Sequence, residues 1–130
     1  MAGCDSFDLE NRLVDFAVRI IRISEALPKS GAGRHLGGQV LRSGTAPAAL
    51  YGEAQGAESR ADFIHKLRSG LKELRETKIW LAMIERAELI RPASKLQAIH
   101  TEADQLVAIF VSSIKTAKRN HANGKSASEP

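Results

Sequence analysis

The chain has 130 residues, enough for one domain with a buried core, and only 5% of them are aromatic. Its net charge of +4 and pI near 9.5 favour acidic partners. The single cysteine, Cys4, excludes an internal disulfide, and no apolar run is long enough to span a membrane. We therefore expect a cytoplasmic protein with no membrane association.

Periodic apolar residues predict an all-α fold, a bundle of helices. Pro28 and Gly31 end the first apolar stripe, and Pro92 begins the last helix. A polar, small-residue-rich composition predicts a disordered end. The expected organisation is a flexible lead-in at 1–7, a bundle at 8–118 with helices at about 8–27, 35–55, 59–89 and 92–118, and a disordered tail at 119–130.

The third segment carries the clearest helical pattern. Ser59 followed by Asp62 is a weak capping box, with a hydroxyl cap and an acid three residues later. Apolar and small residues then recur at steps of four and three, which keeps them on one face of a helix. This stripe consists of Phe63, Leu67, Gly70, Leu74, Thr77, Leu81 and Ile84.

The second segment is unusually rich in small residues. Gly44, Ala48 and Gly52 recur every four residues, and we expect this ridge to allow close approach of a neighbouring helix. Pro47 removes one backbone hydrogen bond and is expected to kink the helix.

These two segments carry a family resemblance, in the strings Leu41-Arg42-Ser43-Gly44-Thr45, Glu58-Ser59-Arg60-Ala61-Asp62-Phe63-Ile64-His65-Lys66-Leu67 and Arg75-Glu76-Thr77-x-x-Trp80-Leu81. They closely resemble the bacterial four-helix-bundle proteins encoded in intervening sequences of 23S rRNA genes, which are related to the accessory protein of diversity-generating retroelements. Leu50 stands where that family usually carries Asn, and Pro47 is unusual in its register.

The resemblance implies an up-and-down antiparallel four-helix bundle that assembles into a homopentamer. It also implies nucleic-acid binding without an enzymatic activity. We therefore expect no cofactor and no catalytic residue, and a function as an RNA-binding accessory module. The alternative is a protein–protein scaffold with no direct nucleic-acid contact.

The residues offer little for metal or nucleophilic chemistry. Di-iron bundles use Glu-x-x-His pairs on facing helices, whereas this chain has Asp62-x-x-His65 and Gln97-x-x-His100. The neutral amide of Gln97 is a poor ligand for a hard cation, and Asp62 and His65 lie off the apolar stripe. We expect no metal site.

Basic residues cluster on two helices. Arg68, Lys72 and Arg75 form a ridge on one side of the third helix, and Arg12, Arg19 and Arg22 cluster on the first. One interpretation is a solvated face with helix ion pairs such as Asp62–Lys66. The other is a surface that contacts phosphates.

Apolar residues outside the core stripes predict self-association, because a bundle buries one stripe per helix. Trp80 also lies off its stripe, and we expect it to contact another subunit more readily than a nucleobase. The expected oligomer interface comprises Val14, Val18, Ile21, Trp80, Val107, Val111 and Ile114.

Overall fold

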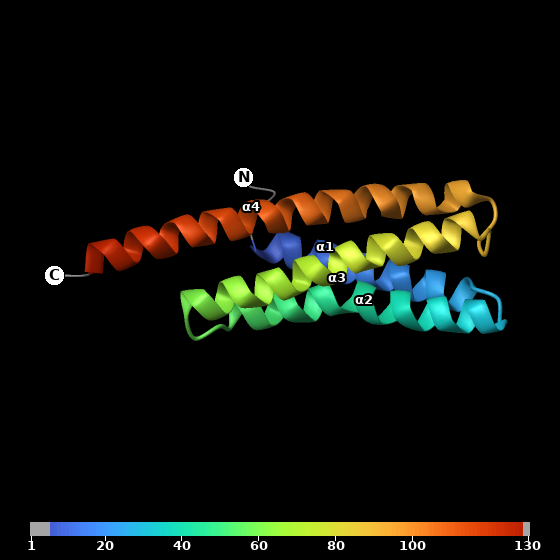
Figure 1. Cartoon of the computed structure of the whole chain (residues 1–130), viewed down its shortest axis with the longest axis horizontal. Coiled ribbons are helices and arrows are strands. Elements are labelled where there is room, and N and C mark those ends of the chain that lie inside the picture. The colour runs from blue at the N-terminus through green and yellow to red at the C-terminus, as the bar shows by residue number, and fades with distance from the viewer. Residues whose placement is uncertain (1–5, 129–130) are drawn as a thin grey trace.

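The computed structural model describes residues 6–128, and side chains from residue 8 to residue 123. It is an antiparallel bundle of four α-helices, and Figure 1 shows each helix lying beside the next one along the chain. α4 is the longest and projects past the turn that joins α2 to α3 (Figure 1). The helices are α1 (Ser6–Ala26), α2 (Gly31–Gln55), α3 (Arg60–Arg86) and α4 (Gln97–Ser128), with a 3₁₀ turn, η1 (Ala93–Leu96), before α4.

Two hydroxyl side chains cap helices at their N-termini. The Ser30 hydroxyl accepts a hydrogen bond from the backbone N–H of Gly33 at 3.1 Å, and Ser59 accepts one from Asp62 at 3.0 Å. The cap at Ser59 confirms the sequence prediction. α2 begins four residues before the predicted residue 35, because Ser30 caps it and Gly33 allows the chain to fold tightly. A Cβ on Gly33 would lie 1.8 Å from the carbonyl oxygen of Pro28.

α3 ends in a Schellman motif rather than continuing to residue 89. The N–H of Leu89 donates to the carbonyl of Ile84 at 3.1 Å, and the N–H of Glu88 donates to Glu85 at 3.0 Å. Glu88 has a φ of 55°, the left-handed conformation that this motif requires and that glycine adopts most easily. The predicted helix was therefore three residues too long.

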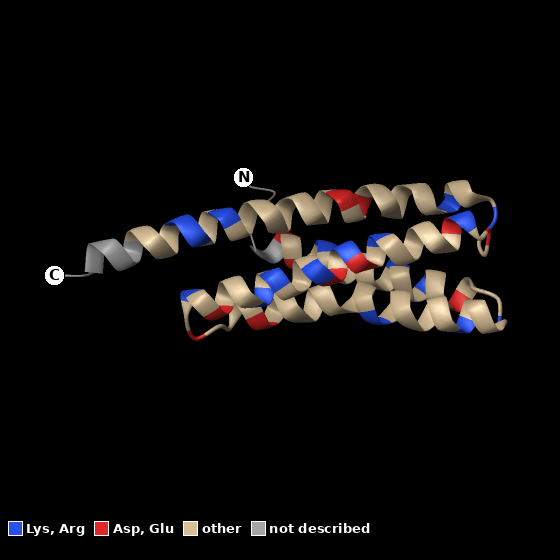
Figure 2. Cartoon of the chain, in the orientation of Figure 1, with Lys and Arg blue, Asp and Glu red and all other residues tan. Residues whose placement is uncertain are grey.

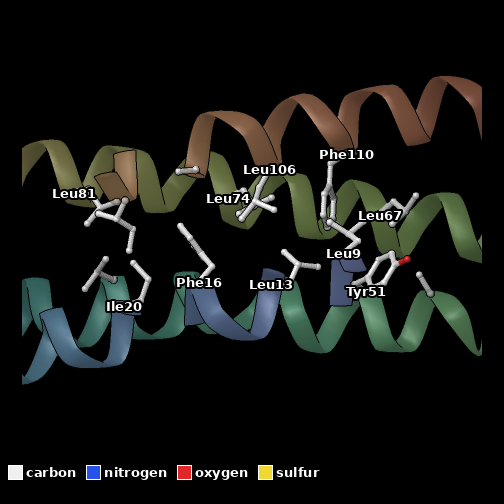
Figure 3. Packing of buried hydrophobic residues seen from close by; sticks show 14 of the residues in the cluster. Leu9, Leu13, Phe16, Ile20, Tyr51, Leu67, Leu74, Leu81, Leu106 and Phe110 are labelled. Atoms are coloured by element: carbon white, nitrogen blue, oxygen red, sulfur yellow. The ribbon is translucent and has the colours of Figure 1, made fainter. Parts of the chain in front are cut away.

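The core fills the space between the α1–α2 pair and the α3–α4 pair (Figure 3). The predicted stripe of α3 is confirmed at Leu67, Leu74 and Leu81, each at most 1% exposed. Phe63 is only half-buried, and the neighbouring Ile64 is buried instead.

Two glycines let helices approach closely. A Cβ on Gly44 would lie 2.7 Å from the side chain of Ile20 on α1, which confirms the predicted close approach at that position. Gly52, the last member of the small-residue ridge, is exposed and has no neighbour within 4 Å of a built Cβ. On the other side of the bundle, Gly70 of α3 gives room to the ring of Phe110 on α4.

One buried polar contact joins α2 to α3. The hydroxyl oxygens of Ser43 and Thr77 lie 2.9 Å apart, and both residues are fully buried. Thr77 also donates to the Glu73 carbonyl at 2.8 Å, so the Ser43 hydroxyl can donate to Thr77. Pro47 is buried within α2, and the helix continues on both sides of it.

The C-terminal prediction was wrong in part. α4 continues as a helix through residues 119–128, where a disordered tail was expected, and residues 129–130 lie outside the described part. At the other end, α1 begins at Ser6, two residues earlier than predicted, and the lead-in at 1–5 is not described. None of the described helices is long and apolar enough to cross a bilayer.

Candidate nucleic-acid interface

The basic ridge of α3, defined as Arg68, Lys72 and Arg75, is exposed along its whole length. The steps of four and three residues place all three side chains on the outer face of the helix. At 1.5 Å of rise per residue, the ridge is about 10 Å long. Figure 2 shows several Lys and Arg residues along the middle of α3.

The acids nearest to the ridge are held by a cation from α2. Arg42 forms ion pairs with Glu73, at 3.0 Å, and with Glu76. Partial desolvation opposes the charge of Arg42, but the hydrogen bond and attraction to Glu73, with those to Glu76, raise its pKa. Glu76 also accepts a hydrogen bond from the indole N–H of Trp80 at 3.2 Å. These acids are therefore turned toward α2 and away from the ridge.

The other cations of the middle of α3 are paired. Lys66 lies 2.9 Å from Glu53 of α2, and Lys78 lies 2.6 Å from Asp104 of α4. The hydrogen bond to Glu53 is the main reason that the pKa of Lys66 is raised. The partner is thus Glu53 and not the predicted Asp62, which acts on Lys66 only through a weaker attraction. Within the described part of the chain, the three ridge cations have no ion pair.

The second predicted basic cluster is divided. Arg12 reaches across to α4, where it lies 2.9 Å from Glu102 and donates to the Gln105 side-chain oxygen at 3.0 Å. Arg12 therefore joins α1 to α4. Arg19 is half-buried and Arg22 is exposed, so these two remain as cations of the surface.

Two lysines near the ridge were not singled out in the sequence. Lys115 and Lys118 of α4 are both exposed. Asp104, Val111 and Lys118 recur every seven residues and so share one face of α4, and the Lys78–Asp104 pair shows that this face borders α3. The spacing of residues within α4 does not by itself place Lys118 beside α3, because that placement also requires the register of α3 against α4.

The predicted apolar face of α1 is confirmed as exposed. Val14 is 46% exposed, and Val18 and Ile21 are each 37% exposed. Leu41 of α2, at 38%, adds a fourth large apolar side chain that the sequence analysis did not predict. α1 packs directly on α2, so these four residues, here called the α1–α2 apolar face, belong to neighbouring helices.

The residues of α4 and α3 that were predicted to form an interface are less exposed than those of α1. Ile114 is only 7% exposed and belongs to the core, so its assignment to an interface was wrong. It lies four residues after Phe110 and three before Ala117, which continues the buried stripe. Val107 and Val111 are half-buried. Trp80 is also half-buried, where it packs against the core and meets His35 edge-on at 6.2 Å.

The histidines and the pockets suggest no particular chemistry. His65 is exposed, and Nε2 of His100 lies 3.1 Å from Glu85 without the alignment of a hydrogen bond. The side chains described, from residue 8 to residue 123, include no group of three or more metal-ligating residues. The main pocket of this region lies between the α2–α3 turn and α4, and small or polar side chains such as Gln55, Ser59 and Thr116 line it.

Comparison with known proteins identifies the family. The model of the 23S rRNA-intervening sequence protein family matches residues 6–112. A crystal structure of a protein of unknown function from the S23 ribosomal protein family of Bacteroides thetaiotaomicron is similar, with 34% identity and a TM-score of 0.78. The match covers 85% of this chain and 97% of that one. No curated protein matches the chain. The chain therefore belongs to the 23S rRNA-intervening sequence protein family.

Proposed function

We propose that this protein is a non-enzymatic, oligomeric RNA-binding accessory module of the cytoplasm, which contacts phosphates through the basic ridge of α3. The observation that carries the proposal is the exposure of Arg68, Lys72 and Arg75 beside acids that Arg42 holds. A solvated face with internal ion pairs, the other interpretation of the sequence, would leave such cations paired along their own helix. Cations that are exposed and unpaired are those that can exchange bound counterions for phosphates.

The experiment is a fluorescence anisotropy titration of labelled RNA with the wild-type protein and two variants. The first variant carries Arg68→Gln, Lys72→Gln and Arg75→Gln, which removes the ridge charge without placing new carboxylates beside Glu73 and Glu76. The matched control carries Lys29→Gln, Arg34→Gln and Lys95→Gln, which removes the same charge from exposed positions near the other end of the bundle.

The ridge variant is expected to lose RNA binding while the control keeps most of it. If both variants lose binding equally, net charge and not the ridge determines affinity. If neither loses it, the ridge is not the RNA site, and Arg19 and Arg22 are the cations to test next. Far-UV circular dichroism of each variant verifies that the helices are retained.

The α1–α2 apolar face supports the oligomeric part of the proposal. Exposed neighbouring apolar side chains of this size commonly mark an interface. A contact between this face and a different face of a second copy would be heterologous, and such contacts close into rings when the rotation permits. The homopentamer implied by the family resemblance is one such ring, and it would repeat the basic ridge around an axis and so raise avidity.

The same apolar face also favours a second candidate function. A protein partner with an apolar surface could bind there, which would make the protein a scaffold without direct nucleic-acid contact. The two candidates differ in their salt dependence, because binding driven by phosphates weakens steeply with salt whereas apolar contact does not.

A further inference from the structure

The ridge is not the only row of cations on its side of the bundle. Lys118 lies on the face of α4 that borders α3, and Lys115 is one turn before it. The helices are antiparallel, and the contacts of Lys78 with Asp104 and of Gly70 with Phe110 set their register. This register places Lys115 level with the stretch of α3 around Leu67, and Lys118 about one turn further on, level with Phe63. The two helices therefore carry cations side by side.

The two rows lie on neighbouring helices. Packed helices have axes about 8–10 Å apart where they touch, so cations on the outer sides of α3 and α4 flank one border. Val107 and Val111, both half-buried, lie on α4 along the border between the helices. The acid at this border, Asp104, is paired with Lys78. A nucleic acid lying over the border would meet positive charge on both sides.

The described Phe, Tyr and Trp side chains offer no exposed platform for unpaired bases. Proteins that hold single strands without sequence preference stack successive bases on exposed aromatic rings. Here Phe16, Tyr51 and Phe110 are buried, while Phe63 and Trp80 are half-buried. Trp80 is further engaged by Glu76 and His35. Of the Phe, Tyr and Trp residues from 8 to 123, none is among the exposed large side chains.

We propose that the α3–α4 face binds double-stranded RNA in preference to single-stranded RNA, through phosphates on both strands and without reading bases. This inference rests on the proposed function. Double-stranded DNA presents about one phosphate per 1.7 Å of axis, twice the density of one of its strands, and an RNA duplex likewise carries two strands of phosphates along one axis. Double-stranded RNA is also recognised mainly by shape and by backbone contacts, for which aromatic stacking is not needed.

The experiment compares two RNA ligands by anisotropy: a short duplex of mixed sequence, and a polyuridine strand of the same length that cannot pair with itself. Wild-type protein is expected to bind the duplex about tenfold more tightly at equal salt, because more phosphates lie within reach of its cations. A second duplex of unrelated sequence is expected to bind with the same affinity.

The α4 lysines provide the sharper test. A variant with Lys115→Gln and Lys118→Gln is expected to lower the salt slope for the duplex by about 1.8, because each phosphate contact contributes about 0.9. Its affinity for polyuridine should hardly change. The matched control is Lys29→Gln with Lys95→Gln, which removes equal charge from distant exposed positions and should leave both affinities as they are.

Polyuridine binding as tight as duplex binding would overturn the duplex preference while the ridge remained the RNA site. An α4 variant with an unchanged duplex slope would overturn the role of the second row. A ridge variant that binds both ligands like wild type would instead overturn the proposed function itself, so the two failures are distinguishable.

Discussion

The ring of Phe110 on α4 occupies the space above Gly70 on α3, where a Cβ would lie 2.6 Å from Cε2 of the ring. Phe110 is fully buried and its ring centroid lies 6.4 Å from that of Tyr51 on α2. The ring therefore cannot move aside without disturbing a third helix. Gly70 is thus required at the centre of the bundle although it weakens α3 locally.

Gly70→Ala is expected to destabilise the protein by about 1–3 kcal/mol, the usual cost of overpacking a filled core. The matched control is Gly38→Ala, at an exposed position within α2 where a Cβ has no neighbour within 4 Å. That change should stabilise the protein by about 0.5–1 kcal/mol, because alanine is the better helix former. Urea denaturation measures both free energies of unfolding. If both variants changed the free energy of unfolding equally, the ring of Phe110 would be able to move aside for the new methyl group without cost.

Leu74→Ala is expected to cost about 2–5 kcal/mol in free energy of unfolding, because Leu74 is completely buried between the helices and its removal leaves a cavity. Denaturant unfolding followed by circular dichroism measures the change. A loss well below this range would mean that the surrounding side chains collapse into the space, and that the core is less tightly packed than the burial indicates.

Glu88→Gly is expected to stabilise the protein by about 1 kcal/mol, because a residue with a side chain at positive φ costs roughly that much relative to glycine. Glu88 has a φ of 55° and closes the Schellman motif of α3. Glu88→Ala provides the control, since it removes the carboxylate but keeps the Cβ. If both variants gained the same stability, the effect would come from charge and not from backbone conformation.

Self-association is expected to depend on the α1–α2 apolar face. Light scattering at micromolar concentration should report an oligomer for the wild type, and Ile21→Glu should shift it toward monomer with its helicity intact. Val111→Glu tests whether the face of α4 beside α3 takes part in the assembly or stays free. Ile114→Glu is the contrasting variant, because Ile114 is in the core and a charge there should unfold the bundle. A monomeric wild type would contradict the assembly and the avidity based on it.

The sequence predicted the helical class and most of the core because heptad-like spacing records burial directly. Leu67, Leu74 and Leu81 lie where the pattern placed them. Periodicity could not decide between adjacent positions near the edge of a stripe, so Ile64 is more buried than its stripe neighbour Phe63, and Ile114 belongs to the core instead of the predicted interface. Which of two adjacent residues enters the core depends on the rotation of the helix against its partners.

The helix ends and the site were harder to predict for physical reasons. Glu88 gives no sequence signal for a helix end, because the left-handed position is normally marked by glycine or asparagine. The isolation of the ridge depends on Arg42, which lies on a different helix and reaches Glu73 and Glu76 only in the folded bundle. The role of Arg12 likewise depends on Glu102, 90 residues away along the chain.

The salt dependence of RNA binding, measured for the wild-type protein and the ridge variant, decides whether the ridge contacts phosphates. If the three ridge cations contact phosphates, each protomer that engages the RNA should contribute about 2.7 to the slope of log K against log salt for a duplex, and about 2.1 for a single strand. Neutralising Arg68, Lys72 and Arg75 should remove that contribution, and the Lys29, Arg34 and Lys95 control should not. RNA binding whose slope is the same in the wild type and the ridge variant would contradict the account.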